Sequence, residues 1–439
     1  MDNASGQVSS GVISEYDVEL KELKIINGFG SFIDIDLIYN EINIYEDIFG
    51  NVIHGDMLIS DAQNIIARLQ LHGNEFLSIY FKSPSLENYK KAFRIYKIAD
   101  YSARSGTSNV QYKVHFCSEE FIVNQQYFVS QSFKQNRLSD VVRIIARDYL
   151  KISTAKLPDA SIELSAKLVT PEKNPLIIPS LRPLEAINWI SSFALSTFDS
   201  SPGFFFYEDR FGFNFKSFDT LFTQNKAKQL SLGPKNTLDN SPLLKHNQID
   251  NIEFRHVFDL LDNMNQGAYH SNIVKVDYLN RDIENSEFRL TNQKLRTLNG
   301  YYPFNLSPNR FGDSIDRAST YFRMFPKFQG ELVSNWLLVR AARLSLLNSM
   351  KVQIDLPGDS GLTVGQLVEL DLPDNAARTD GRAITSDKML SGIYLITGLR
   401  HRIVRNKYTC HAELCKDSVA FDLTNLPPRN SLWDSVTNS

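Results

Sequence analysis

Four carboxylates lie close together near the start of the chain, at Glu46, Asp47, Asp56 and Asp61. A pair of neighbouring carboxylates can act as the acid and base of a hydrolase, and a cluster can bind a divalent cation. Asp56 and Asp61, however, are separated by an expected strand-to-helix junction, and this is not the spacing of a metal-binding loop. We therefore expect the four to have structural roles at a strand end, a turn and a helix cap.

A second group could bind zinc, because Cys410, His411 and Cys415 lie near His401 across an expected hairpin. Cys410 and Cys415 should point to opposite faces of one strand, so they do not converge on a tetrahedral ion. The patterns of serine hydrolases, zinc proteases, P-loops and dinucleotide-binding folds are also absent from the sequence. The sequence thus predicts no catalytic residue, no metal site and no cofactor.

Composition limits the class of protein further. The chain has 439 residues, of which 42% are hydrophobic and 11% aromatic, and this favours a strand-rich fold with a large core. A net charge of −3 gives no electrostatic footprint for binding nucleic acid over a whole face, although it leaves room for a local basic patch, and three cysteines are too few for a disulfide framework. Neither a targeting segment nor an apolar run of about 18 residues is visible. We expect synthesis in a cytoplasm and no stable membrane association.

Periodicity divides the chain into regions. Residues 1–13 are expected to be a disordered arm, and residues 14–121 alternate in polarity as half-buried strands do. Ser60 and Gln63 form a potential capping box for a short helix that ends near Leu69. Residues 122–250 predict a separate α+β domain, with helices at 138–150 and 182–195 packed on the aromatic hairpin "GFFFYEDRFGFNFKSF".

The rest of the chain returns to strands. Residues 251–282 and 331–420 predict a second β region, with helices near "FRHVFDLLDNMN" and over 331–350. Residues 283–330 are expected to be an irregular insertion. Residues 421–439 are expected to be a tail, because Pro427 and Pro428 cannot extend the last strand.

Two distant segments share one order of strand, turn and strand. Residues 94–120 and 392–418 each run from Ile-Tyr through a strand, a polar turn and a second strand that ends near a cysteine. A short strand after a glycine precedes each of them, at 73–81 and 365–373. The repeat predicts a sheet module used twice in one chain.

The stretch "INIYEDIFGNVIHGDMLISDAQNIIARLQLHGNEFLSIYF" resembles the first barrel of the central baseplate hub protein of contractile-tailed bacteriophages. The matching residues are Gly55, Leu58, Asp61, Asn64, Gly73, Asn74 and Glu75. The resemblance continues in "RPLEAINWISSFAL", "GQLVELDLP" and "GIYLITGLRHRIVRNKYTCHAEL". The N-terminal part of type VI secretion spike proteins is similar, but this sequence has neither their oligosaccharide-binding-type domain nor their β-helix needle.

The resemblance implies a fold that is mainly β with α+β insertions, and two similar β-barrel hub domains per chain. It also implies a homotrimer whose six barrels form a pseudo-six-fold ring. Such a hub is a structural, non-enzymatic protein that adapts a six-fold tail tube to a three-fold central spike. The implied partners are the spike protein, the tube or tube-initiator protein and the tape-measure protein, with DNA only in transit. The implied location is the virion tail baseplate, after synthesis in the host bacterial cytoplasm.

Three questions stay open in the sequence. A hub or spike component of a type VI-like secretion system, or of another contractile injection system, fits the same pattern. A tail-delivered cell-wall hydrolase is a further alternative, although no segment supplies its catalytic set. In the tail, Leu432 and Trp433 either fold back on their own subunit or anchor in a groove of a neighbouring subunit or partner.

Overall fold

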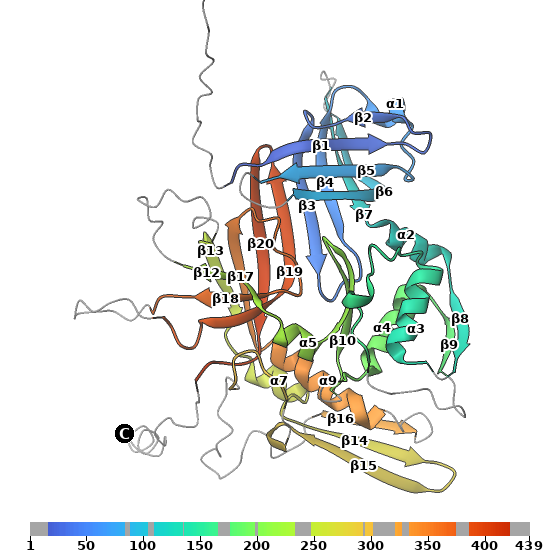
Figure 1. Ribbon diagram of the computed structural model, residues 1–439, viewed down its shortest axis with the longest axis vertical. Helices are drawn as coiled ribbons and strands as arrows, with labels where there is room; N and C mark the ends of the chain where they lie inside the picture. The colour runs from blue at the N-terminus through green and yellow to red at the C-terminus, as the bar shows by residue number, and fades with distance from the viewer. Residues whose placement is uncertain are drawn as a thin grey trace, which may run out of the picture.

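One large sheet dominates the computed structural model (Figure 1). The structure describes residues 16–83, 88–103, 109–134, 136–165, 176–197, 201–232, 247–292, 295–301, 321–326, 333–374 and 386–421. Within these residues, no helix is both long enough and apolar enough to span a membrane. The expected arm at 1–13 and almost all of the expected tail lie outside them.

The first half of the large sheet is formed by residues before Glu119, and we call it the first unit. Its strands are β1 (Glu19–Ile26), β3 (Tyr39–Asp47), β4 (His54–Asp61), β5 (Phe76–Lys82), β6 (Asn88–Ala103) and β7 (Val110–Cys117), with β2 (Phe32–Asp34) beside β1 and helix α1 (Ile65–Leu69) after β4. They pair in the order β3-β4-β7-β6-β5-β1, and every pair is antiparallel.

The second half of the sheet, the second unit, repeats this order. It consists of β12 (Lys226–Ser231), β13 (Asn251–His256), β17 (Met350–Pro357), β18 (Leu367–Asp371), β19 (Gly392–Val404) and β20 (Lys407–Lys416). They pair in the order β13-β17-β20-β19-β18-β12. Taken in chain order, the six strands of each unit therefore occupy the same places, except that β12 is parallel to β18 whereas β1 is antiparallel to β5.

The two units join along a seam between β3 and β19. Seven residue pairs run antiparallel from Gly398 opposite Asp47 to Val404 opposite Glu41. Ile42 and Ile44 of β3 and Ile403 of β19 are fully buried in one core that extends through both units. The seam therefore makes the two units a single packed body.

An α+β region lies beside the sheet (Figure 1). It contains α2 (Glu119–Gln126), β8 (Val129–Phe133), α3 (Leu138–Ile144) with a π-helical extension (Ile145–Tyr149), a 3-10 turn (Asp159–Ser161), β9 (Leu176–Leu181), α4 (Pro183–Phe193), β10 (Phe204–Asp209), β11 (Gly212–Ser217) and α5 (Phe218–Thr223). Both expected helices are present, and they pack on the β10–β11 hairpin in a core of their own.

Strand β10 belongs to both cores, because its side chains alternate. Phe204 and Phe206 point into the α+β core, whereas Phe205 and Tyr207 point into the core of the large sheet. The α+β region is thus fixed to the two units by a shared strand.

A third region surrounds a small sheet. It consists of α7 (Leu260–Asn265), β14 (His270–Asp277), β15 (Asp282–Arg289), a 3-10 turn (Leu290–Asn292), β16 (Tyr321–Pro326) and α9 (Val333–Leu347), with strand order β15-β14-β16. Its core includes Leu338 and Leu346 of α9 and Ile273 of β14.

Four expectations about individual elements need correction. The described parts of 283–330 are not wholly irregular, since β15 and β16 pair with β14. Residues 251–256 form a strand because they pair with β17, and the helix begins only at Leu260. The expected α+β domain does not extend to 250, since β12 pairs with β18. Finally, Ser60 lies in β4 and caps no helix.

The cap before α1 is made by a carboxylate. Asp61 Oδ1 accepts from the Gln63 N–H at 2.7 Å, and Oδ2 accepts from the Ile65 N–H at 2.7 Å. Pairing of β4 with β7 continues to Asp61, so the chain leaves the sheet one residue after the expected cap. One carboxylate can satisfy two backbone donors at once, which a serine hydroxyl does less well.

Candidate functional site: the buried polar junction between the two units

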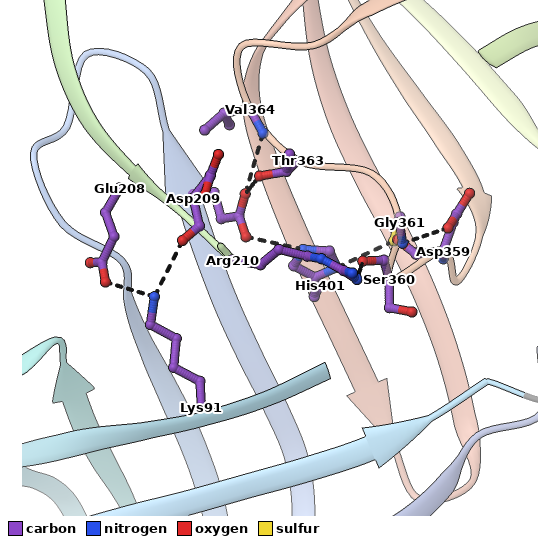
Figure 2. Close-up of polar contacts among 12 residues, drawn as sticks. Lys91, Glu208, Asp209, Arg210, Asp359, Ser360, Gly361, Thr363, Val364 and His401 are labelled. Carbon is purple, nitrogen blue, oxygen red and sulfur yellow. Dashed lines mark hydrogen bonds and ion pairs between the residues drawn. The ribbon is translucent and has the colours of Figure 1, made fainter. Parts of the chain in front are cut away.

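A buried carboxylate and imidazole face each other across the seam. Glu46 of β3 and His401 of β19 are both fully buried, with 3.7 Å between Oε1 and Nε2. Glu46 Oε2 also accepts hydrogen bonds from the Thr363 hydroxyl at 2.5 Å and from the Val364 N–H at 3.2 Å. Figure 2 shows how Thr363 and Val364, in the loop before β18, reach this point.

The charges of this pair support each other. Burial alone would raise the pKa of Glu46, but His401 and the Thr363 hydroxyl hold it below its ordinary value. Burial alone would lower the pKa of His401, but Cys410 and Glu46 raise it to about 10. An ionised carboxylate beside an imidazolium is the arrangement that follows.

The same histidine touches a thiol and a phenol. Its Nδ1 lies 2.7 Å from the Tyr408 hydroxyl and 3.5 Å from Cys410 Sγ. Cysteine, histidine and a carboxylate are the residue types of a thiol hydrolase. Here all three are fully buried, and Cys410 packs against the backbone of Asp359, so the set lies inside the core and does not line a cleft.

A second buried ion pair ties the α+β region to the first unit. Lys91 Nζ of β6 lies 2.6 Å from Glu208 Oε1 at the end of β10, where the lysine side chain is 12% exposed and the glutamate 1%. Glu208 Oε2 accepts from the Ile53 N–H at 2.8 Å. Burial raises the pKa of Glu208 although Lys91 opposes the shift.

The tip of the β10–β11 hairpin then reaches the second unit (Figure 2). Asp209 accepts from the N–H groups of Phe211 and Gly212 at 2.8 and 2.9 Å, which shapes the turn. The guanidinium of Arg210 donates to the Ser360 carbonyl in the loop before β18. In the same loop, Asp359 pairs with Lys228 of β12 at 2.7 Å.

This junction holds three chain regions in one orientation. Buried ion pairs add little net stability compared with apolar packing, but removing one partner leaves an unpaired charge in the core. Such a set of contacts therefore specifies a unique arrangement of the first unit, the second unit and the α+β hairpin. Its role is positional, since Glu46, His401 and Glu208 are buried inside the core.

The other three carboxylates near the N-terminus have local partners. Asp47 accepts from the Phe49 N–H at 2.8 Å in the turn after β3. Asp56 accepts from the Asn43 amide and the Tyr45 hydroxyl, each at 3.1 Å, and Asp61 caps α1. Their structural roles are as predicted, whereas the buried junction role of Glu46 was missed. Its partners lie more than 300 positions away, so no local signal could indicate them.

The residues considered for zinc do not converge. His401 and Cys410 face each other in the core, while His411 Nδ1 contacts Asp355 Oδ1 at 2.5 Å elsewhere on β20. Cys415 Sγ lies near the Thr397 hydroxyl at 3.5 Å. In the part of the chain that the structure describes, no group of three His, Cys, Asp or Glu side chains could hold a metal ion. Leu432 and Trp433 lie outside the described residues.

Comparison with known proteins gives the fold. No family model and no curated protein matches this sequence. The structure is similar to that of a tail protein from Neisseria meningitidis MC58, with a TM-score of 0.54 at 11% identity over 92% of this chain and 97% of that one. It is also similar to the 43 kDa tail protein of prophage MuSo2 from Shewanella oneidensis, with a TM-score of 0.53 at 10% identity over 91% and 99%.

At these identities the likeness concerns the fold. The chain is mainly β, with a large antiparallel sheet, and has the fold of these two tail proteins over nearly their whole length. The predicted resemblance to tail proteins is confirmed at that level.

Proposed function

We propose that this protein is the structural hub of a contractile phage tail baseplate, where it adapts a six-fold tail tube to a three-fold central spike. In this proposal the two units are two copies of one hub β-barrel. Three chains alternate these barrels around a ring, so that the tube meets six similar surfaces and the spike meets three identical chains.

The observation that carries the proposal is the strand order repeated in one chain. Both units place six strands in the same sequence-to-space order, and one sheet runs through both across the β3–β19 seam. A protein that binds a six-fold partner with three copies needs two similar surfaces per copy at a fixed angle. The fold shared with the two tail proteins supports the same assignment.

The buried polar junction supports a role that depends on fixed geometry. Glu46–His401 and Lys91–Glu208 each require their partners at short range inside the core. A ring closes only if every unit keeps its angle to the next, and these contacts set the angle within a chain.

The direct test is the assembly state. Purified full-length protein should contain three copies by native mass spectrometry, with an interface on the order of 2,000 Å² or more per contact. It should also capture the central spike protein encoded in the same tail gene cluster. A stable monomer that neither assembles alone nor with the spike contradicts the proposal.

A second assay separates the structural role from catalysis. The protein should leave peptidoglycan uncleared in a zymogram, with lysozyme as the positive control. Clearing would identify a hydrolase and overturn the structural assignment, even if it persists in a Cys410→Ala variant.

The tail is part of the proposal at residue level. We assign Leu432 and Trp433 as an anchor in a groove of the spike or of a neighbouring chain, since tryptophan is frequent at the centres of interfaces. Deleting residues 427–439 should abolish spike capture with three copies still associated if the groove belongs to the spike, and should abolish association if it belongs to a neighbouring chain. Unchanged capture and unchanged association would remove this role.

A further inference from the structure

Two strand edges are open in the described part of the molecule. Residues up to Arg94 of β6 pair with β5, and the Ile95 N–H donates to the Glu75 carbonyl, but from Tyr96 onward β6 pairs with β7 alone. Strand β13 pairs only with β17. Most residues from Tyr96 to Ala103 and every second residue of β13 are exposed, including Tyr101, which is 62% exposed. Open edges of this length offer backbone groups to another strand.

The repeat identifies what each open edge corresponds to. In the hairpins, Cys117 and Cys415 occupy equivalent places, and β6 and β19 each carry one extra residue at the same point, Tyr96 and Thr397. Counting from these positions, β6 corresponds to β19. Strands β4 and β17 occupy the same place in the two units. Because β13 pairs with β17 as β3 pairs with β4, β13 corresponds to β3.

In the second unit the corresponding edge is not open, because the late half of β19 pairs with β3. We infer that β6 of one copy pairs antiparallel with β13 of the next copy, as β19 pairs with β3 within a chain. This inference rests on the proposed ring, and names the surfaces that close it. Transferring the seam register places Ala99 opposite His256 and Ser102 opposite Glu253.

Two irregularities that played no part in choosing the partners agree with this register. Compared with β19, β6 has one more extra residue between Ala99 and Ser102, where Asp100 adopts a φ of 52°. Compared with β3, β13 has one extra residue at Arg255. The transferred register puts Asp100 directly opposite Arg255. The two bulges thus cancel, and residues of opposite charge face each other.

The neighbouring pair is apolar. The same register places Tyr101 opposite Phe254, the positions that His401 and Ile44 occupy in the seam. Tyr101 stacks on the buried Tyr112 with 6.4 Å between ring centroids, so it lies on the inward face. Phe254 is half-buried against the large core. Pairing would cover two aromatic rings that are incompletely buried in one copy.

Cysteine cross-linking tests the register. The variant S102C/E253C places thiols on directly opposite residues, close enough for a disulfide. Mild oxidation should give covalent dimers and trimers on a non-reducing gel. The control A99C/E253C moves one thiol by two ladder positions, roughly 7 Å along the strand, and should give none. The native cysteines 117, 410 and 415 are buried and should not contribute.

Charge and ring variants test the two facing pairs. D100N keeps a side chain that tolerates positive φ, and should weaken association about threefold, as should R255Q. The double variant should associate no more weakly than the weaker of the two single variants, because each substitution removes the same Asp100–Arg255 interaction. Tyr101→Ala should weaken association about tenfold. Tyr278→Ala, a control on the exposed β14–β15 turn, should have no effect.

The outcomes separate this inference from the proposed function. Register-specific cross-links with non-additive charge variants support the β6–β13 contact. Three associated copies without the S102C/E253C cross-link overturn the contact and leave the hub proposal standing. A chain that is monomeric alone and with the spike overturns both.

Discussion

The first and second units place six strands in the same order but fill equivalent positions differently. Where the second unit has His401 opposite Cys410, the first has Tyr101 stacked on Tyr112. In the second unit β3 covers this position, and the imidazole is buried with a carboxylate partner. In the first unit the edge is open, and a large aromatic ring is exposed. The presence or absence of a strand over this position, more than the fold itself, decides which side chain is stable at it.

A second difference lies at the ends of the hairpins. Lys416 of the second unit donates to the carbonyls of Met389, Leu390 and Ser391 at 2.8, 3.3 and 3.0 Å, and burial lowers its pKa to about 7. Ser118 stands at the equivalent place in the first unit. The second unit therefore carries two buried groups, His401 and Lys416, whose pKa values change on folding. The first unit has neither group at the equivalent positions.

The largest expected effect comes from breaking the seam pair. Glu46→Ala leaves His401 buried without its carboxylate and should lower the free energy of unfolding by about 3–5 kcal/mol. Glu41→Ala is the matched control on the same strand, because Glu41 pairs with Arg400 and Arg402 in a half-exposed place and should cost about 1 kcal/mol or less. Urea unfolding measures both. Equal losses would contradict a special role for the buried seam pair.

The hairpin contact should be nearly as sensitive. Lys91→Met leaves Glu208 buried and unpaired and should cost about 3 kcal/mol or more, whereas Lys91→Met with Glu208→Gln should recover part of that loss. Lys90→Met, on the exposed neighbour, is the control. If the double variant is less stable than Lys91→Met, the ion pair is not what orients the hairpin.

The pH dependence sharpens the comparison, because the two buried groups act in opposite directions. The raised pKa of His401 gives stability that is full below about pH 6.5 and is lost as the pH rises toward 10. The lowered pKa of Lys416 disfavours the folded state below about pH 7, and this penalty disappears as the pH rises toward 10.5. Between roughly pH 7 and 8.5 the two slopes should nearly cancel.

Variants separate the two slopes. Lys416→Met should make stability fall with pH by up to about 1.4 kcal/mol per unit, and the pair Glu46→Gln with His401→Gln should make it rise. Unfolding midpoints across this range measure the sign. Two variants with the same slope would contradict the assigned directions.

The smallest expected effect concerns the equivalent thiols. Burial raises the pKa of Cys117 to about 12 and of Cys415 to about 11. Both should therefore stay unreactive toward a thiol reagent at pH 8 in the folded protein and react fully in denaturant. Rapid labelling of one without unfolding would show that the two units are not equally packed there.

The sequence predicted the elements whose signal is local. Alternating polarity indicated the hairpins at 94–120 and 392–418, and apolar spacing with Pro183 indicated α4. It failed where pairing decided the outcome. Residues 251–256 form β13 because β17 lies beside them, and β12 belongs to the second unit because β18 does.

The junction was beyond local patterns for the same reason. Glu46 lies on a strand whose carboxylates otherwise have near neighbours as partners, and His401 lies in a basic run that is typical of an exposed turn. Only the β3–β19 pairing, between the two ends of the chain, brings them together. The repeated hairpins indicated two similar sheet modules, but not the junction between them.

The central claim is that two equivalent units per chain close into a ring of three. The most direct measurement is native mass spectrometry of the full-length protein, with electron microscopy of the same sample. The account predicts a mass three times that of one chain and a ring with six similar lobes around a channel. A stable monomer, or a closed ring with another number of copies, would contradict it.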